Sequence, residues 1–582
     1  DQSEKPLAGI KVSDGLNVVE TAADGSFTLP GHERERFIFI TTPSGYKTFN
    51  RHYHKIEKKQ SGYDFGLIPY SGRIRKDGSH RYIHITDTEI FNTENHADWV
   101  NNVHDYARNE QAAFIIHTGD LCYEKGLKAH IKLMNTENMD CPVFYCIGNH
   151  DLVKGKYGEE LFESIYGPVY YSFDAGNVHY VVTPMPGGDH APGYTSDDVC
   201  RWLKNDLTHI RPGTPVVVFN HDLLTYEDTF IFKSKNAGSI NLNEYNLKAW
   251  VYGHWHINYM KKQGDVYSVC TSSLDKGGID HSTTAFRVMH VDSKGDFTSE
   301  LRYTYLDKNI CIASPAGVMA SGVLPVAVNV YSSVSPVREV LYTCLADGKP
   351  VLKNKRLLQS TDWSWNGELP LSHKYVGKEL TLRVTARFNN GEIAEAESNF
   401  ICRTEKAVPL FSADWDNLSG NAKHSAPVSA PLNLPLQLAW TNNVGANLYM
   451  TSPLIHKGKV IVASVDEDLK GAGHVYALNG KDGTILWSCP VRNSIKNSIA
   501  VDSDIVFAQD AQGFLYAIDT ETGKLCWEKQ LPVNGLPALI DGLVAGEGVV
   551  YAGTGKGLCA FEARTGKQLW KNEGWGQGEG TT

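Results

Sequence analysis

The sequence predicts a multidomain protein in which one layered α/β region is flanked by all-β domains. Between residues 73 and 308, five apolar runs of strand-like composition each end in a polar cluster, with helical segments between them. This pattern is typical of α/β layers that carry a site at the strand ends. Before and after this region, apolar and polar positions alternate around turn signals, which indicates β-strands.

Length and composition limit the possible classes. With 582 residues the chain is too long for one hydrophobic core. The formal net charge is -10 and no long basic run occurs, so a nucleic-acid surface is not indicated. No apolar stretch is long enough to span a bilayer. The 11 cysteines form no C-x-x-C pair and their number is odd, so we expect neither a disulfide framework nor a zinc knuckle.

The first 72 residues are predicted to form a small β-domain. Asp24-Gly25-Ser26-Phe27 marks a turn, and residues 37–41 form a strong strand candidate. The run from Gly9 to Leu29 resembles the transthyretin-like β-sandwich of secreted proteins. The chain begins at Asp1 without a Met, so we expect that a signal peptide has been removed.

The polar clusters at the predicted strand ends contain the residues of a metal site. A pair of metal ions needs oxygen and imidazole ligands that converge from several loops, with one carboxylate able to bridge. The five clusters offer such ligands: Asp87-Thr88-Glu89, Gly119-Asp120, Gly148-Asn149-His150-Asp151, Asn220-His221 and Gly253-His254-Trp255-His256. We expect the glycines at 119, 148 and 253 to let the backbone turn sharply.

In their order, these clusters resemble the motif series D-x-H, G-D, G-N-H-D, a lone His and G-H-x-H of calcineurin-like metallophosphoesterases. The first block departs from the series, because Glu89 stands where the family has His. A Glu carboxylate can still coordinate a hard metal; alternatively, Glu89 points away and leaves the first site weak. His84 and His117 precede the site and are expected to be core histidines or outer partners of the ligands.

The resemblance implies a four-layer α/β sandwich and a residue-by-residue assignment. It implies that Asp87, Glu89, Asp120 and His256 hold one metal ion, that Asn149, His221 and His254 hold the other, and that Asp120 bridges the two. It implies that His150 protonates the leaving oxygen or stabilises its charge, and that Asp151 orients His150 through a hydrogen bond. The ions would be Mn, Fe or Zn, and no residue is assigned to an organic cofactor. The expected reaction is hydrolysis of a phosphomonoester or phosphodiester substrate.

The rest of the chain is predicted to be all-β. Residues 309–405 contain alternating strands and are expected to form an Ig-like β-sandwich, followed by a Pro- and Ser-rich linker over 406–430. Residues 431–582 repeat with a period of about forty residues, with a turn and a Trp in each copy. These copies resemble blades of quinoprotein (PQQ-like) β-propellers. About three blades are present and closure typically needs four, so we expect a propeller that continues past Thr582.

Two other functions fit parts of the sequence. If Glu89 weakens the first metal site, the chain is a binding protein built on a phosphoesterase fold. A quinone-dependent dehydrogenase would need a closed propeller with a calcium site, and the adjacent Cys-Cys pair found in several such enzymes does not occur. The β-domains resemble those of bacterial periplasmic or surface proteins, so an extracytoplasmic location is expected.

Overall fold

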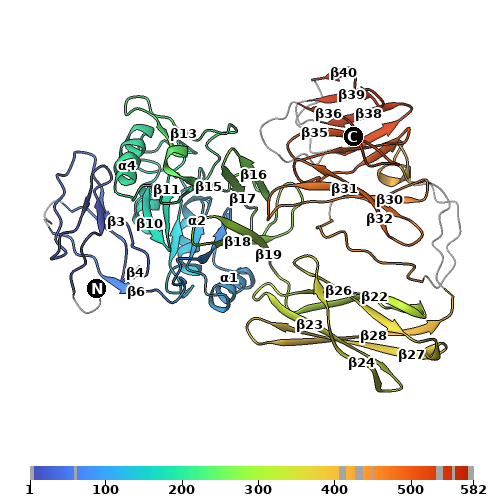
Figure 1. Cartoon of the computed structure of the whole chain (residues 1–582). Coiled ribbons are helices and arrows are strands. Elements are labelled where there is room, and N and C mark those ends of the chain that lie inside the picture. The colour runs from blue at the N-terminus through green and yellow to red at the C-terminus, as the bar shows by residue number, and fades with distance from the viewer. Residues whose placement is uncertain are drawn as a thin grey trace. The chain divides into compact units, whose positions relative to one another are not determined.

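The computed structural model describes residues 5–57, 60, 62–405, 414–425, 437–448, 451–531, 542–553 and 557–573. The chain divides into two compact units, Asp1–Tyr305 and Leu306–Thr582, and each is described by itself (Figure 1). None of the described helices is long and apolar enough to cross a membrane. Each of the 11 cysteines is a free thiol.

The first unit begins with a small β-domain. Its main sheet has the order β2-β1-β3-β5, and a separate pair joins β4 to β6. All four residues of β3 are buried. The domain packs on the region that follows, because the ring of Phe39 lies 6.3 Å from that of Trp202 and the hydroxyl of Thr41 lies 2.8 Å from that of Ser172. The strands are β1 (Lys11–Ser13), β2 (Val18–Glu20), β3 (Phe37–Ile40), β4 (Tyr46–Thr48), β5 (Tyr53–Lys55) and β6 (Leu67–Pro69).

Two larger sheets form the centre of this unit. The first has the order β19-β18-β7-β8-β9, and the second has the order β10-β11-β12-β15-β17-β16. Strands β7, β8 and β9 are parallel to one another, and so are β11, β12, β15 and β17. Each sheet therefore brings the carboxyl ends of several strands to one edge. The first sheet comprises β7 (His80–Ile85), β8 (Phe114–His117), β9 (Val143–Tyr145), β18 (Ala285–Val291) and β19 (Phe297–Tyr303). The second comprises β10 (Tyr171–Ala175), β11 (Val178–Val182), β12 (Val216–Phe219), β15 (Leu247–Tyr252), β16 (Tyr259–Gln263) and β17 (Val266–Cys270).

Aromatic side chains fill the space between the two sheets. Tyr82 and Phe114, from the first sheet, stack with their ring centroids 4.7 Å apart. Phe114 also meets Tyr180 of the second sheet edge-on at 5.0 Å, and Tyr180 stacks on Phe219 at 5.7 Å. Burial of these rings stabilises the packing of one sheet on the other.

Helices cover the outer faces of both sheets. Helix α1 (Ala97–Asn109) buries Trp99 and Val103 in one cluster with Ile83 and Ile115 of the first sheet. Helix α4 (Ser196–Thr208) begins with a capping box between Thr195 and Asp198 and is bonded to the second sheet through Asp206. The predicted α/β layers are thus confirmed. The remaining elements are α2 (Tyr123–Leu133), α3 (Glu160–Tyr166), the hairpin of β13 (Ile231–Phe232) and β14 (Ile240–Asn241), and a 3₁₀ turn over Leu242–Tyr245.

The second unit contains a two-sheet β-sandwich. One sheet has the order β20-β22-β26-β25 and the other β21-β28-β27-β23-β24, and both contribute side chains to one core. Burial alternates along β27 and β23, as expected for strands with one face inward. The strands are β20 (Asn309–Ser314), β21 (Gly317–Ala320), β22 (Gly322–Tyr331), β23 (Val337–Ala346), β24 (Lys349–Arg356), β25 (Leu358–Gln359), β26 (Ser364–Leu371), β27 (Glu379–Phe388) and β28 (Ile393–Arg403).

Three four-stranded antiparallel sheets follow, one for each described repeat. They comprise β29 (Leu454–His456), β30 (Lys459–Ala463), β31 (Gly473–Asn479) and β32 (Ile485–Val491); β33 (Ala500–Asp502), β34 (Ile505–Gln509), β35 (Phe514–Asp519) and β36 (Leu525–Gln530); and β37 (Leu543–Gly546), β38 (Val549–Gly553), β39 (Leu558–Glu562) and β40 (Gln568–Asn572). Of the predicted linker, residues 406–413 and 426–430 lie outside the described part. Trp415, within the remainder, pairs with Ile455 of β29.

The Trp of one repeat is fixed by the turn of the next. Trp487 of β32 donates its indole N–H to the carbonyl of Thr520, at 3.0 Å, and Trp527 of β36 donates to that of Ala563, at 2.9 Å. A Cβ placed on Gly523 or Gly566 would lie 2.7 Å from the ring of the preceding repeat's Trp. Glycine is therefore required at these turns both by its positive φ and by the ring above it.

Candidate functional site

The candidate ligands lie on loops at the carboxyl ends of parallel strands. Asp87 follows β7, Asp120 follows β8, Asn149 follows β9, His221 follows β12 and His254 follows β15. Several of these residues have a left-handed backbone, with φ of 50° at Asp87, 57° at Asp120 and 65° at His254. Such conformations cost free energy in non-glycine residues and cluster at functional sites.

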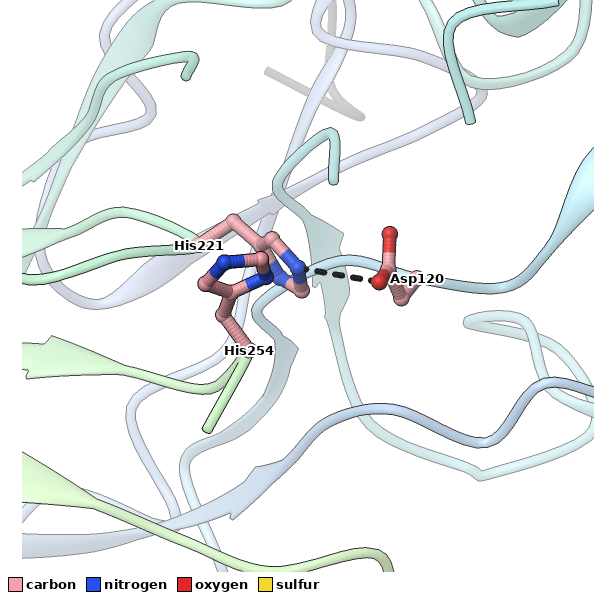
Figure 2. A group of neighbouring side chains, drawn as sticks. All are labelled: Asp120, His221 and His254. Atoms are coloured by element: carbon pink, nitrogen blue, oxygen red, sulfur yellow. Dashed lines mark ion pairs between the residues drawn. The ribbon is translucent and has the colours of Figure 1, made fainter. Parts of the chain in front are cut away.

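Asp120, His221 and His254 form the centre of the site. One ligand atom from each lies within 4.8 Å of the others, and Nε2 of His221 is 3.1 Å from Oδ2 of Asp120 (Figure 2). Nδ1 of His221 lies 2.7 Å from the carbonyl of Thr118, to which it donates. In the neutral ring this hydrogen bond fixes the tautomer, and it directs Nε2 at the group, the arrangement found in metal-binding histidines.

Asp87, Glu89 and His256 form a second group beside the first. Nε2 of His256 lies 3.4 Å from Oδ1 of Asp87 and 3.5 Å from Oε1 of Glu89. Oδ1 of Asp87 is also 3.9 Å from Nε2 of His221, which connects the two groups. Of the two orientations considered for Glu89, the structure has the one that faces the site. The other carboxylate oxygen of Glu89 accepts a hydrogen bond from Nζ of Lys276 at 3.1 Å.

Two buried atoms indicate that these groups suit a metal ion. Oδ1 of Asn149 and Nε2 of His221 are shielded from solvent and make no hydrogen bond of acceptable geometry to the described residues. Leaving such atoms unpaired is costly, and native proteins usually pair them with protein, water or an ion. Amide oxygen and imidazole nitrogen are both established ligands of divalent metals. The residues present therefore fit a metal centre.

Glycines allow the loops to come this close. A Cβ on Gly148 would lie 2.2 Å from Oδ1 of Asp120, and one on Gly253 would lie 1.9 Å from Oγ1 of Thr86. Sharp turns were expected at all three glycines, but only Gly119 has a positive φ, at 104°. At Gly148 and Gly253 the requirement is close approach of another loop instead.

The structure does not contain the expected hydrogen bond between the side chains of Asp151 and His150, and each side chain has other partners. The carboxylate of Asp151 is fully buried and accepts hydrogen bonds from the backbone N–H groups of Asp120, Cys122 and Gly148, each at 2.9 Å. Its side chain turns inward while that of its neighbour His150 turns outward. Nδ1 of His150 is instead 2.8 Å from Oδ2 of Asp189. Asp151 thus holds the loops together, and Asp189 orients His150.

The close carboxylates and imidazoles shift one another's protonation. Burial alone would lower the pKa of His221, but Asp120 raises it to about 10. Burial and the nearby charge of Asp120 raise the pKa of Asp151 to about 7. Partial burial lowers the pKa of His150, but the hydrogen bond that its ring donates to Asp189 and the charge of Asp120 outweigh it, so that the net shift is upward. The field of the site is negative and favours cations.

His84 and His117 support the loops from behind, as expected. His84 is bonded to the hydroxyls of Thr118 and Thr271, both at 2.8 Å, and Nδ1 of His117 accepts from the N–H of Gly119 at 3.1 Å. Burial lowers the pKa of both imidazoles well below the ordinary value, so they are neutral.

Three residues near the site were not found by sequence reasoning. Asp189 lies in the loop after β11, and Lys276 follows β17; neither stands in a recognisable motif. Cys122 was noted only as a cysteine, yet its sulfur lies within 4.8 Å of carboxylate oxygens of Glu89 and Asp120. For Cys122 a signal existed, because it follows Asp120 by two residues in the same loop.

Comparison with protein families assigns three segments of the chain. Residues 80–258 match the model for calcineurin-like phosphoesterases, and residues 1–69 match the model for the N-terminal region of calcineurin-like phosphoesterases. Residues 437–577 match the model described as outer membrane protein assembly factor BamB. The resemblances inferred from the strand-end motifs and from the forty-residue repeat are confirmed.

Individual relatives match parts of the chain. Purple acid phosphatase 13 of Arabidopsis thaliana is 26% identical over 215 residues, which is 34% of this chain and 36% of the relative. Quinohemoprotein alcohol dehydrogenase ADH-IIG of Pseudomonas putida is 26% identical over 117 residues, which is 17% of this chain and 16% of the relative. The crystal structure of BamB from Moraxella catarrhalis aligns with a TM-score of 0.20 at 18% identity, over 24% of this chain and 40% of that one. The chain therefore spans about a third or less of the curated relatives' length.

Proposed function

Because residues 80–258 carry a calcineurin-like phosphoesterase domain, we propose that this chain hydrolyses a phosphomonoester or phosphodiester with two metal ions. One observation supports the proposal: seven candidate ligands lie on five separate loops at strand ends, and two of their atoms, Oδ1 of Asn149 and Nε2 of His221, are buried and make no hydrogen bond of acceptable geometry to the described residues. A structural polar cluster would satisfy those atoms within the protein.

The proposed ligand sets follow the two groups of side chains. Asp87, Glu89 and His256 would hold one ion, Asn149, His221 and His254 would hold the other, and Asp120 would serve both. Mn, Fe or Zn suits this mixture of carboxylate, amide and imidazole donors. When bound, such a pair lowers the pKa of a water molecule and offsets the charge of the phosphoryl oxygens.

The protein's own groups would act on the leaving side of the phosphate. His150 lies at the edge of the site, where its backbone N–H donates to Oδ1 of Asp120 at 3.0 Å. With Nδ1 held by Asp189, the other ring nitrogen can give a proton to the leaving oxygen as the P–O bond breaks. Asp151 keeps the loops of Asp120 and Gly148 in register, so that the ligands stay in position.

The binding-protein alternative has one observation in its favour. Nζ of Lys276 lies 3.1 Å from a carboxylate oxygen of Glu89, so an ammonium group already neutralises part of the first ligand set. If that pairing prevents metal binding, the fold retains a ligand site without turnover. As for location, the match of residues 437–577 to an outer membrane assembly factor supports the extracytoplasmic assignment.

The test is metal content together with turnover. Purified protein would be assayed by elemental analysis, then with p-nitrophenyl phosphate and bis-p-nitrophenyl phosphate in the presence of Mn, Fe or Zn ions in turn, beside an Asp120→Ala variant. About two metal ions per chain and hydrolysis that is lost in the variant are expected. Metal-free protein without turnover under any of the three metals would refute the proposal and leave the binding alternative.

A further inference from the structure

Two exposed aromatic rings extend from the catalytic candidate His150 toward solvent. The ring centroid of Tyr123 lies 5.3 Å from that of His150, and the ring of Phe91 lies 6.4 Å from Tyr123 with an interplanar angle of 18°. Phe91 is 56% exposed and Tyr123 is 44% exposed. We call Phe91 and Tyr123 the aromatic ledge.

The ledge differs from ordinary exposed apolar residues. Single exposed aromatics are common on protein surfaces, but here two nearly parallel rings lie in series beside a reacting group. Most other large aromatic side chains of this region, such as Tyr82 and Phe114, are buried between the sheets. The two rings of the ledge are exposed to solvent, so packing in the core does not explain their position.

The backbone fixes the ledge against the site. Tyr123 begins helix α2 with a φ of 57°, directly after Cys122 with a φ of 69°. The N–H of Tyr123 donates to the carbonyl of His150 at 3.0 Å. Phe91 lies two residues after Glu89, in the loop of the first ligand group. Both rings are therefore attached to segments that also carry candidate ligands.

The direction of the leaving group connects the ledge to the reaction. His150 is anchored to Asp120 through its backbone and is proposed to protonate the leaving oxygen. The group attached to that oxygen then extends past His150, where it meets Tyr123 and, beyond it, Phe91. On the basis of the proposed function, we infer that the aromatic ledge is a subsite for the leaving group and favours phosphoesters whose leaving group carries a planar aromatic ring, aryl or nucleobase.

The test compares matched substrates that differ only in the ring. Phenyl phosphate would be paired with cyclohexyl phosphate, and adenosine 5′-monophosphate with ribose 5-phosphate, in metal-loaded wild-type protein and in Phe91→Ala. Because aryl groups leave more easily in any case, the measured quantity is the ratio of variant to wild type for each substrate. We expect Phe91→Ala to lower kcat/KM about threefold to tenfold for the aromatic member of at least one pair and to leave its saturated partner unchanged. The pair that responds identifies an aryl or a nucleobase ligand.

Three further variants separate stacking from simple apolar contact. Phe91→Tyr keeps a ring and should retain the wild-type preference, whereas Phe91→Leu keeps apolar bulk and should behave like Phe91→Ala. Tyr123→Phe should likewise retain it, because the ring and not the hydroxyl is invoked. Equal losses for aromatic and saturated substrates, or no change in either pair, would overturn the inference even if hydrolysis itself is observed.

Binding measurements keep the inference testable without turnover. Calorimetric titration of the metal-loaded protein with phenylphosphonate and cyclohexylphosphonate, which lack a hydrolysable P–O–C bond, should show tighter binding of the phenyl compound in wild type but not in Phe91→Ala. Absence of hydrolysis with this preference intact would refute the proposed function but keep the subsite. Equal affinity for the two phosphonates in wild type would refute the subsite itself.

Discussion

Oδ2 of Asp189 lies 2.8 Å from Nδ1 of His150, although 39 residues separate them in the chain. Asp189 is in turn held by its own N–H, which donates to the carbonyl of Asn149 at 3.1 Å. The loop after β11 is thus bonded both to the candidate proton donor and to the loop of a candidate metal ligand. Asp189 acts through His150 and is a positioning residue.

Replacement of Asp189 by Asn should impair the leaving-group side of the reaction. Loss of the carboxylate removes a group that orients His150 and stabilises its protonated form, so we expect kcat to fall about tenfold to hundredfold with little change in KM. The loss should be larger for alkyl phosphates than for p-nitrophenyl phosphate, whose leaving group needs no proton. A loss of the same size for both esters would indicate a merely structural role.

Replacement of Gly148 by Ala should abolish activity for a steric reason. The added Cβ would lie 2.2 Å from Oδ1 and 2.3 Å from the backbone N of Asp120, so one loop must move. A displacement of about 1 Å at a catalytic group can cost about a hundredfold in rate, and we expect at least that loss in kcat/KM. Gly187→Ala is the matched control, because a Cβ there meets nothing within 4 Å. Near-normal activity in Gly148→Ala would contradict the assigned approach of the two loops.

Removal of the Lys276 ammonium group should strengthen binding of the first metal ion. Lys276→Met retains most of the side-chain stem but frees Glu89 to act as a full carboxylate ligand. Because Lys276 is 45% exposed, the gain is modest, and we expect the Kd for Mn²⁺ in metal-stripped protein to fall about twofold to fivefold. Titration calorimetry on wild type, Lys276→Met and the charge-conserving Lys276→Arg would measure it. Weaker binding in the Met variant would mean that Lys276 helps to build the site rather than competing with it.

His179 should make stability depend on pH above neutrality. Its ring is buried between Asp174, 2.6 Å from Nδ1, and Asp206, 2.8 Å from Nε2; Lys11 lies 3.5 Å from the other oxygen of Asp174. Burial would lower the pKa of His179, but the two carboxylates raise it to about 9 from an ordinary value of 6.5. The raised value means that folding favours the protonated form. The stabilisation that protonated His179 contributes to the folded state is complete below pH 6.5. It is lost as pH rises toward 9, and the loss is about 3 kcal/mol at most.

The measurement is the difference in unfolding free energy between wild type and His179→Gln, followed by urea denaturation from pH 6.5 to 9. The difference in unfolding free energy should shrink as pH rises from 6.5 to 9. In this range the His179 ring of the folded wild type is protonated and releases its proton on unfolding, whereas the Gln side chain does not titrate. Other titrating groups cancel in the comparison. A pH-independent difference would show that His179 is neutral in the folded protein.

Most of the site could be inferred from sequence because its ligands occur in short contiguous motifs. A Gly-Asn-His-Asp run after a strand places a candidate ligand and a candidate proton donor on one loop. Contacts between loops carry no such signal, so the pairing of Asp189 with His150 and of Lys276 with Glu89 could not be derived. The role given to Asp151 was wrong because neighbours in sequence were taken as neighbours in space, whereas its carboxylate turns toward three backbone N–H groups.

In the fold, too, local features could be predicted from the sequence, whereas contacts between distant segments could not. The repeats could be located from their period, because the turn and the Trp of each copy are local features. The order of strands in the two central sheets joins β18 to β7 across about two hundred residues, and that pairing depends on packing against distant segments.

The Trp–Gly contact between successive repeats also bears on how such an array can evolve. In the described repeats, the Trp of one copy packs on the Gly of the next: Trp487 on Gly523, and Trp527 on Gly566. Each copy therefore supplies a Gly to the contact with the preceding copy and a Trp to the contact with the following copy. A duplicated gene segment of this kind is complementary to its parent from the moment it arises, so the array can lengthen without inventing a new interface.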